Sequence, residues 1–446
     1  MMKPRQLLLL LFAVVAGTVL FRGWWDNGGK PLAEYGIPGD GAAAQEGEQP
    51  QDEYTQHDHH EAAEKFQNKL RQRQRPTAQQ QDKQLPQVQF VVPDGLSQLE
   101  EAMLSADARS GGEDDLPEEL KLSDAVYVDV DELPTCASLG LADQPNAADA
   151  KPARVFDTVL FNSEFTQAEV RFMTLANVVD YFVVVEANIT HQGTPKPYYF
   201  DSMWERLDDA LKAKIIRVKL EMTTDTGDAT AGQWRYEQYM RRHGTIQMGA
   251  IAKGGAQAGD IVMVSDLDEI PRPSLVLSLK LDRCQVAYPI TVEVALSYYS
   301  FRVLHNPTWL HPNIDRLGSS GSDYQCTGQD LRENGKPPCI SKTVIHKGGW
   351  SCSWCFKTIG RYLNKVQSYP HVEHNTPQFN RPEHIARHIF QGADLFDRSF
   401  IHNTVLPPGQ PVDAPSYLLD HPDRFDYLLD HLQKPFVQVY ADSKKQ

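Results

Sequence analysis

Three carboxylates follow an apolar run in residues 261–271, which read IVMVSDLDEIP. The run predicts a buried strand, and Asp266, Asp268 and Glu269 come at its end. Carboxylates so close together repel one another unless a cation joins them, and their hard oxygen ligands suit Mn2+ or Mg2+. We therefore expect Asp266 and Asp268 to bind a divalent metal ion. A solvated acidic turn is the alternative, because D-x-D is a short motif.

Alternating strand and helix patterns surround this motif. Strand patterns cover residues 154–161, 180–187, 215–220 and 260–266, with helical patterns over 165–179, 203–214 and 232–255 between them. This alternation predicts an α/β fold with a mostly parallel, Rossmann-like sheet that is covered on both faces. Ligands of such sheets bind beyond the carboxyl ends of the strands, where Glu186 and the D-x-D motif fall.

The N-terminus has the pattern of a membrane anchor. Lys3 and Arg5 precede an uncharged apolar run over residues 7–21, and two tryptophans follow that run. The run is shorter than the roughly 20 residues that span a bilayer, yet its basic flank and interfacial tryptophans suit a signal-anchor over residues 1–25 with a short cytoplasmic tail. A cleaved signal peptide is the alternative. Either segment delivers the rest of the chain to the secretory lumen.

Residues 26–123 have the composition of a disordered stem. They are rich in Gln, Glu, Asp, Gly and Pro and hold few aromatic or β-branched side chains. Such a segment cannot bury enough apolar surface to offset the entropy of ordering, so we expect the folded domain over residues 124–446. The formal net charge of -15 argues against a nucleic-acid partner.

All six cysteines follow the stem, where this organisation places them in an oxidising compartment that allows disulfides. They are Cys136, Cys284, Cys326, Cys339, Cys352 and Cys355. The SCSWC segment also resembles a redox or half-zinc C-x-x-C motif, but no second such pair accompanies it and the lumen favours structural bridges. The spacing leaves open which cysteine pairs with which.

Five segments, taken in order, resemble blocks of glycosyltransferase family 17. They read VFDTVLFNSEFTQAEVRF, VVDYFVVVEANITHQGTPKPYYF, GDIVMVSDLDEIPRP, HKGGWSCSWCF and SYPHVEHNTPQFNRPEHIARHIFQGADLFDR. The resemblance implies a GT-A type nucleotide-sugar transferase domain, a UDP-GlcNAc donor and an inverting reaction. It further implies transfer to a mannose of N-glycans in β-1,4 linkage, the bisecting type, although the family also holds members with other glycan or glycoprotein acceptors. Together with the anchor, it implies a single-pass type II protein of the Golgi membrane.

The chemistry of this transfer suggests roles for several side chains. A divalent cation must neutralise the charge that grows on the departing diphosphate, so we expect Asp268 to bind the metal directly, with Asp266 toward the ribose or the metal's waters. Glu186 is a candidate for a hydrogen bond to the nucleoside. The alternative is that it pairs with a neighbouring arginine. Lys196 and Arg235 are candidates for the diphosphate, with a solvent-facing position as the alternative.

The acceptor is expected at the segment IHKGGWSCSWCF, residues 345–356. Trp350 and Trp354 offer flat apolar faces for sugar C–H surfaces, and His346 is a further candidate for substrate binding. Either tryptophan could instead belong to the core, and we expect one of them to be buried and one exposed.

An inverting transfer needs a general base for the acceptor hydroxyl. Glu373, Glu293 and Asp323 are the carboxylates considered for this role. We favour Glu373, because it follows the acceptor segment and occupies a loop framed by a proline and a helical pattern. A surface glutamate between two histidines is the alternative.

Two other classes of protein could carry a D-x-D motif or bind glycans. A phosphohydrolase of the haloacid dehalogenase type places its aspartates after the first strand of the domain, whereas this pair follows a later strand. A secreted carbohydrate-binding protein would not need the nucleotide-binding half. Retention of UDP by the purified domain would separate the three classes.

Overall fold

The computed structural model describes residues 116–145, 151–251, 255–318, 326–334, 337–407 and 409–429. The anchor expected at residues 1–25, most of the stem and Asp323 lie outside these ranges. Within the described ranges, no helix has the length and apolarity that crossing a membrane requires.

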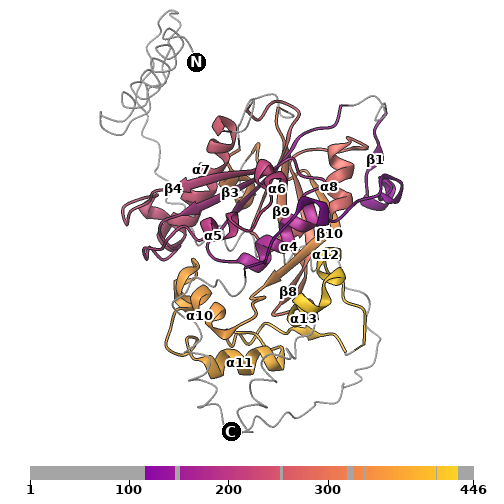
Figure 1. The fold of residues 1–446 in the computed structure, drawn as a ribbon. Helices are drawn as coiled ribbons and strands as arrows, with labels where there is room; N and C mark the ends of the chain where they lie inside the picture. Colours follow the sequence, from indigo (N-terminus) through magenta and orange to yellow (C-terminus); the bar gives the residue numbers. More distant parts are fainter. Residues whose placement is uncertain are drawn as a thin grey trace, which may run out of the picture. The chain divides into compact units, whose positions relative to one another are not determined.

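Four parallel strands form the first half of a nine-stranded sheet (Figure 1). In spatial order they are β4 (Ile215–Leu220), β3 (Tyr181–Ala187), β2 (Val155–Leu160) and β5 (Ile261–Ser265). Every residue of β2 and β5 is buried, because helices cover both faces of this half. The expected parallel α/β arrangement is confirmed here, and the strand patterns in the sequence were accurate to a residue or two.

The second half of the sheet is mixed. It continues from β5 through β9 (Val303–Arg316), β8 (Ile290–Tyr298), β10 (Thr343–Ser353) and β6 (Glu269–Pro271), with β11 (Thr404–Val405) paired to β9. β9 runs antiparallel to β5 and β8, because the four-residue connection between β8 and β9 can join only antiparallel neighbours. β10 returns parallel to β8 and carries β6 antiparallel on its other edge.

Helices pack on both faces of the sheet. One face contacts apolar side chains from α4 (Phe165–Leu175), α5 (Phe200–Trp204), α6 (Asp209–Lys214), α8 (Pro273–Lys280), α12 (Ser416–Asp420) and α13 (Pro422–Leu429). The other face contacts α7 (Arg235–Ile251) and α9 (Gly328–Glu333). Each face therefore has its own apolar core, as expected for a sheet with a helical layer on either side.

A third apolar cluster joins the ends of β8 and β9 to α10 (Ile359–Ser368) and α11 (Pro382–Gln391). Figure 1 shows these two helices together below the main helical layers, near the end of β8. The 3-10 turn η7 (Val372–His374) connects them, and a second 3-10 segment, η6 (Ala229–Trp234), leads into α7. This arrangement brings η7 to the carboxyl edge of the parallel strands, where a glutamine of η6 contacts it.

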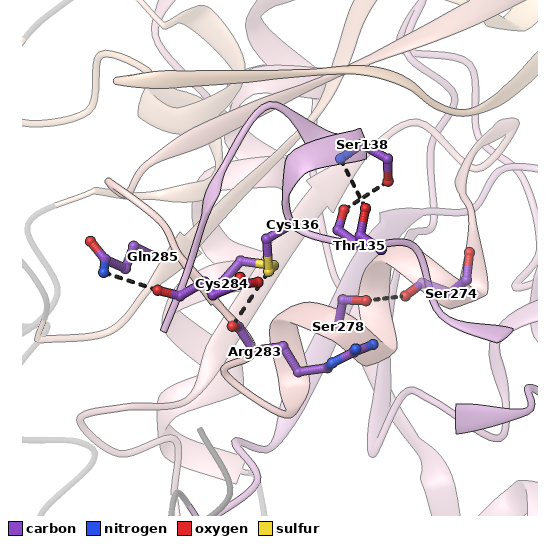
Figure 2. The surroundings of a disulfide bond; sticks show 9 residues. Thr135, Cys136, Ser138, Ser274, Ser278, Arg283, Cys284 and Gln285 are labelled. Atoms are coloured by element: carbon purple, nitrogen blue, oxygen red, sulfur yellow. Dashed lines mark hydrogen bonds between the residues drawn. A yellow bond between two sulfur atoms is a disulfide. The ribbon is translucent and has the colours of Figure 1, made fainter. Parts of the chain in front are cut away.

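Three disulfides form, as the sequence analysis allowed, and one of them lies within SCSWC. They join Cys136 to Cys284, Cys326 to Cys339 and Cys352 to Cys355. Figure 2 shows the first, which ties the segment before η4 (Ala137–Leu139) to β7 (Cys284–Gln285) across 148 residues of sequence. β1 (Ala142–Asp143) pairs with β7 beside it, so the N-terminal segment is held at the end of α8.

Ordered packing begins before the boundary expected at residue 123. Leu120 is only 3% exposed and forms an isolated bridge with Leu207. The 3-10 turns η2 (Leu122–Asp124) and η3 (Val130–Glu132) follow it, and the Val126 N–H donates to the carbonyl of Met173 on α4. A few residues assigned to the stem by composition therefore belong to the core of the folded domain.

Candidate active site

The D-x-D turn lies at the carboxyl end of β5, in the middle of the sheet between β2 and β9. The turn closes on itself, because the Asp266 N–H donates to Glu269 Oε2 at 2.7 Å and the Glu269 N–H donates to the Asp266 carbonyl at 3.1 Å. Glu269 then enters β6, opposite Ser351 of β10. The sequence pattern therefore located the turn correctly relative to the strands.

Asp266 lies between two arginines. Its Oδ1 accepts from Arg241 on α7, and its Oδ2 accepts from Arg332 on α9 at 2.7 Å. Burial alone would oppose ionisation, but these two guanidinium groups hold the pKa of Asp266 well below its usual range. The side chain is still 41% exposed, so an ionised carboxylate is partly accessible to solvent.

Glu269 holds the turn in place. Its carboxylate is 2% exposed and accepts from Arg332 at 2.5 Å and from Trp309 Nε1 at 2.8 Å. The planar guanidinium of Arg332 therefore bridges the two carboxylates, donating to Glu269 from one terminal nitrogen and to Asp266 from the other. These contacts leave Glu269 a supporting role beside the two aspartates.

Asp268 is the carboxylate without a compensating partner. No described residue forms a hydrogen bond or ion pair with its side chain, and only its main-chain carbonyl is held, by the Cys352 N–H at 3.2 Å. Burial raises the pKa of Asp268 to about 7; Lys365 opposes the rise, and the Asp266 and Glu269 carboxylates add to it. A half-buried oxygen ligand with uncompensated charge is what a hard divalent cation stabilises.

Lys365 on α10 is the positive charge that interacts most strongly with Asp268. Burial opposes its charge, yet Asp268 and Glu164 raise its pKa. Its Nζ lies 3.8 Å from Glu164 Oε1, at the start of α4, and 5.6 Å from the ring centre of Trp354. Lys365 and Arg332 were not among the residues expected at the site, because each lies on a short helix whose sequence pattern does not indicate which residue it will face.

Arg241 replaces Arg235 as the arginine of α7 that reaches the turn. The two are six positions apart and cannot share a helix face, and the expectation had favoured Arg235. Arg235 instead donates to the carbonyl of Thr224 at 2.6 Å and contacts Tyr236. It therefore anchors the loop before α7, and the structure gives it no contact with the turn.

Glu186 and Lys196, both expected at the donor, are paired with each other. Lys196 Nζ donates to Glu186 Oε1 at 2.7 Å, and the side chains are 4% and 3% exposed. Glu186 also accepts from the N–H groups of Tyr199 at 2.7 Å and Phe200 at 3.1 Å, so it caps the start of α5. Burial raises the pKa of Glu186 and lowers that of Lys196. This closed pair supports the fold and leaves neither group free for a ligand.

Both tryptophans of the expected acceptor segment are buried, against the expectation of one exposed ring. Trp350 is 6% exposed, donates from Nε1 to Asp413 at 2.7 Å and lies under Arg272. Trp354 is 3% exposed and packs between Tyr362 and Phe396. Trp350 belongs to the interior strand β10 and enters the core on one face of the sheet, whereas Trp354 follows the end of β10 and packs in the cluster of α10 and α11.

His346 lies far from the D-x-D turn. It is exposed and contacts Glu293 at 3.0 Å, on the amino-terminal side of β10 and β8. Cys352, which contacts Asp268, is six residues further along β10, or roughly 15–20 Å at the usual rise per residue of a strand. The structure therefore separates both His346 and the alternative base Glu293 from the site.

Glu373 lies in η7 at the carboxyl edge of the parallel strands. It accepts from Gln233 of η6 at 3.1 Å and pairs with His371 at 2.7 Å. Partial burial opposes ionisation, but His371 lowers the pKa of Glu373. His371, Glu373 and His374 also bring their ligand atoms within 4.8 Å of one another. The carboxylate is thus ionised, half exposed and oriented from two sides.

Comparison with known proteins agrees with this architecture. A model of glycosyltransferase family 17 matches residues 129–432. The β-1,4-mannosyl-glycoprotein 4-β-N-acetylglucosaminyltransferases of Homo sapiens and Mus musculus are each 28% identical to the chain over 306 residues, which is 63% of this chain and 56% and 55% of the two relatives. The chain therefore spans just over half the length of these relatives. Because the family model covers more than half of the chain and includes the D-x-D turn, the chain belongs to glycosyltransferase family 17.

Proposed function

We propose that this chain is an inverting, metal-dependent transferase of the GT-A type that moves GlcNAc from UDP-GlcNAc to a mannose of N-glycans in β-1,4 linkage. The observation that carries the proposal is the uncompensated Asp268 beside the arginine-held Asp266, at the end of a central strand in a family 17 domain. The names of the matched relatives support the sugar and the acceptor class.

A divalent cation fits the donor atoms of the turn. Asp268 and the exposed side of Asp266 offer hard oxygen ligands, and Asp268 has no protein cation bonded to it among the described residues. Mn2+ or Mg2+ prefers such ligands and leaves positions for phosphate oxygens. When bound, the ion supplies charge neutralisation for the departing diphosphate.

The surrounding cations have separate tasks in this proposal. Arg241 and Arg332 keep Asp266 ionised and fix its orientation, so that it does not turn away from the donor. Lys365 is partly exposed beside Glu164, and its positive charge would stabilise the departing diphosphate. The ring of Trp354, 5.6 Å from Lys365 Nζ, adds a favourable contact for this charge.

Glu373 is the proposed general base. The acceptor hydroxyl oxygen forms a bond to the anomeric carbon while the bond from that carbon to the β-phosphate oxygen breaks. The hydroxyl proton passes to the Glu373 carboxylate, and UDP leaves with the bonding electron pair. The lowered pKa of Glu373 keeps it ionised at neutral pH, and the contact with Gln233 limits its rotation.

We also propose a Golgi location, with residues 1–25 as a type II anchor and the following segment as a stem. The basic flank, the apolar run and the tryptophans of the N-terminus support this arrangement. Three disulfides in the domain fit an oxidising lumen.

The test is transfer by the purified domain from UDP-GlcNAc and Mn2+ to a biantennary N-glycan. We expect one added N-acetylhexosamine by mass spectrometry, sensitive to chelator and abolished by Asp268→Ala. Asp209→Ala, at an exposed carboxylate on α6, is the matched control and should retain activity. Transfer only to glycans that lack the branching mannose would change the acceptor assignment, and full activity in excess chelator would remove the metal.

A further inference from the structure

Two histidines and an aspartate meet at α11, outside the D-x-D turn. His384 and His388 are four residues apart on this helix, so they share one of its faces, and their ring centres are 3.9 Å apart. Asp397 follows the end of the helix, and one ligand atom from each of the three residues lies within 4.8 Å of the others. The histidines are 6% and 4% exposed, so this group, the α11 cluster, is built into the fold.

Main-chain carbonyls take one ring N–H of each histidine. His384 Nε2 lies 2.7 Å from the carbonyl oxygen of Leu395, and His388 Nδ1 lies 2.6 Å from that of His384. A carbonyl oxygen can only accept, so each of these nitrogens carries a proton. His384 Nδ1 and His388 Nε2 remain for other partners. Histidines that bind metals have the same arrangement, in which a carbonyl behind the ring fixes the tautomer and leaves the second nitrogen to the ion.

His388 Nε2 faces a carboxylate oxygen, Asp397 Oδ1, at 2.7 Å. Gln378 donates to the other oxygen, Oδ2, at 3.0 Å and so holds the carboxylate in this orientation. Because His388 Nδ1 already donates, the short contact at Nε2 needs a positive charge, which is either a second ring proton or a metal ion. A proton would satisfy His388 and Asp397 but would leave the buried His384 Nδ1 unused, since no described residue donates to it. A metal ion uses all three side chains.

We propose that His384, His388 and Asp397 bind one Zn2+ ion, separate from the metal expected at the D-x-D turn. Two imidazole nitrogens and one carboxylate oxygen are a common set of three protein ligands for zinc, and a water completes the tetrahedron. Imidazole suits Zn2+, whereas Mg2+ and Mn2+ prefer oxygen ligands, so the two sites would select different ions. The proposal does not depend on which sugar the chain transfers.

The ion would fasten the segment after α11 to the helix. Leu395 and Asp397, which contact the two histidines, flank Phe396 in the sequence. The ring of Phe396 stacks on His374 of η7, with 3.7 Å between the ring centres. η7 also carries Glu373, the proposed general base. Zinc at the α11 cluster would therefore stabilise the packing on one side of η7.

Zinc binding by the full chain tests the proposal. The chain is dialysed against Zn2+ with excess Mg2+, and bound zinc is counted per chain. His388→Gln removes one ligand. Asp397→Asn removes another and keeps the backbone, because Asp397 has a φ of 53°, in the left-handed region that asparagine also adopts. His346→Gln is the matched control, since His346 pairs with Glu293 and lies outside the α11 cluster. Other histidines, such as those in residues 57–60, are the same in every variant and cancel in the difference.

We expect His388→Gln to bind one Zn2+ fewer per chain than the unmodified protein. Asp397→Asn should hold this ion at least about 10-fold more weakly, because mutating even the partners behind metal ligands costs that much. The control should match the unmodified protein. Zinc should also raise the urea unfolding midpoint of the unmodified protein and the control by more than that of the two cluster variants.

Equal zinc binding by all four proteins would mean that His388 and Asp397 share a proton only, and it would overturn the inference. Displacement of the ion by Mg2+ would do the same, as would an unchanged zinc affinity in Asp397→Asn. Circular dichroism checks the folding of each variant. Should His388→Gln fail to fold, Asp397→Asn decides alone, because its side chain is 46% exposed and its backbone conformation is kept.

Discussion

Replacing Asp268 by asparagine should stabilise the metal-free protein while it removes the metal response. The pKa of Asp268 rises from 3.8 to about 7 because folding buries a carboxylate to which no described side chain is bonded, and the charge of Lys365 offsets this only in part. Folding therefore favours the protonated form, and the ionised form costs stability that asparagine, a neutral group of the same shape, does not.

The size of the effect follows from the linkage between protonation and folding. The unfolded chain releases this proton near pH 4 and the folded chain near pH 7, so the folded state loses stability as pH rises through that window, and the loss is constant above it. The full difference corresponds to about 4 kcal/mol as an upper bound. Because the side chain is partly exposed and solvent screens it, we expect Asp268→Asn to gain about 1–2 kcal/mol at pH 8, and less at pH 5.

Urea unfolding in the presence of chelator measures the gain in unfolding free energy of Asp268→Asn at pH 5 and at pH 8. Asp266→Asn is the matched control and should lose stability at pH 8, because it removes an ionised partner from Arg241 and Arg332. Mn2+ should raise the unfolding midpoint of the unmodified protein and leave that of Asp268→Asn unchanged. A variant that is no more stable than the unmodified protein at pH 8, or whose gain does not shrink at pH 5, would show that Asp268 is not an uncompensated carboxylate.

Three further outcomes are expected. Glu373→Gln should lower kcat by about 10²–10⁴-fold with UDP affinity unchanged, and a comparable loss in Glu293→Gln instead would move the base to β8. Arg332→Met should destabilise the domain by about 3 kcal/mol, because it leaves two carboxylates facing each other beside the turn; urea unfolding checks this, and an unchanged midpoint would contradict it. A chain that begins at residue 126 should unfold more easily than one that begins at 116 by roughly 2–3 kcal/mol, the cost of losing the buried Leu120; equal stability of the two would show that the segment before 126 only lies on the surface.

Much of the first half of the fold could be predicted from local patterns. Strands β2, β3, β4 and β5 are continuous apolar runs because they are buried on both faces, and such runs stand out from the helical periodicity between them. The position of Asp266 and Asp268 at a strand's carboxyl end follows from the same pattern. The second half of the sheet is harder to predict from the sequence. The hairpin of β8 and β9 reverses the strand direction, and β9 has exposed residues in its middle, so it lacks a continuous apolar run.

The sequence by itself determined which segments form the parallel half of the sheet and where the acidic turn falls, because apolar periodicity and the end of a strand are local properties. The tertiary structure alone decided which charges meet there. Arg332 contacts Asp266 across 66 residues, whereas Lys196 pairs with Glu186, and Trp350 and Trp354 enter the core. Side-chain partners of this kind depend on the order in which strands and helices pack, and a charged or aromatic residue carries no local signal of the neighbour it will find.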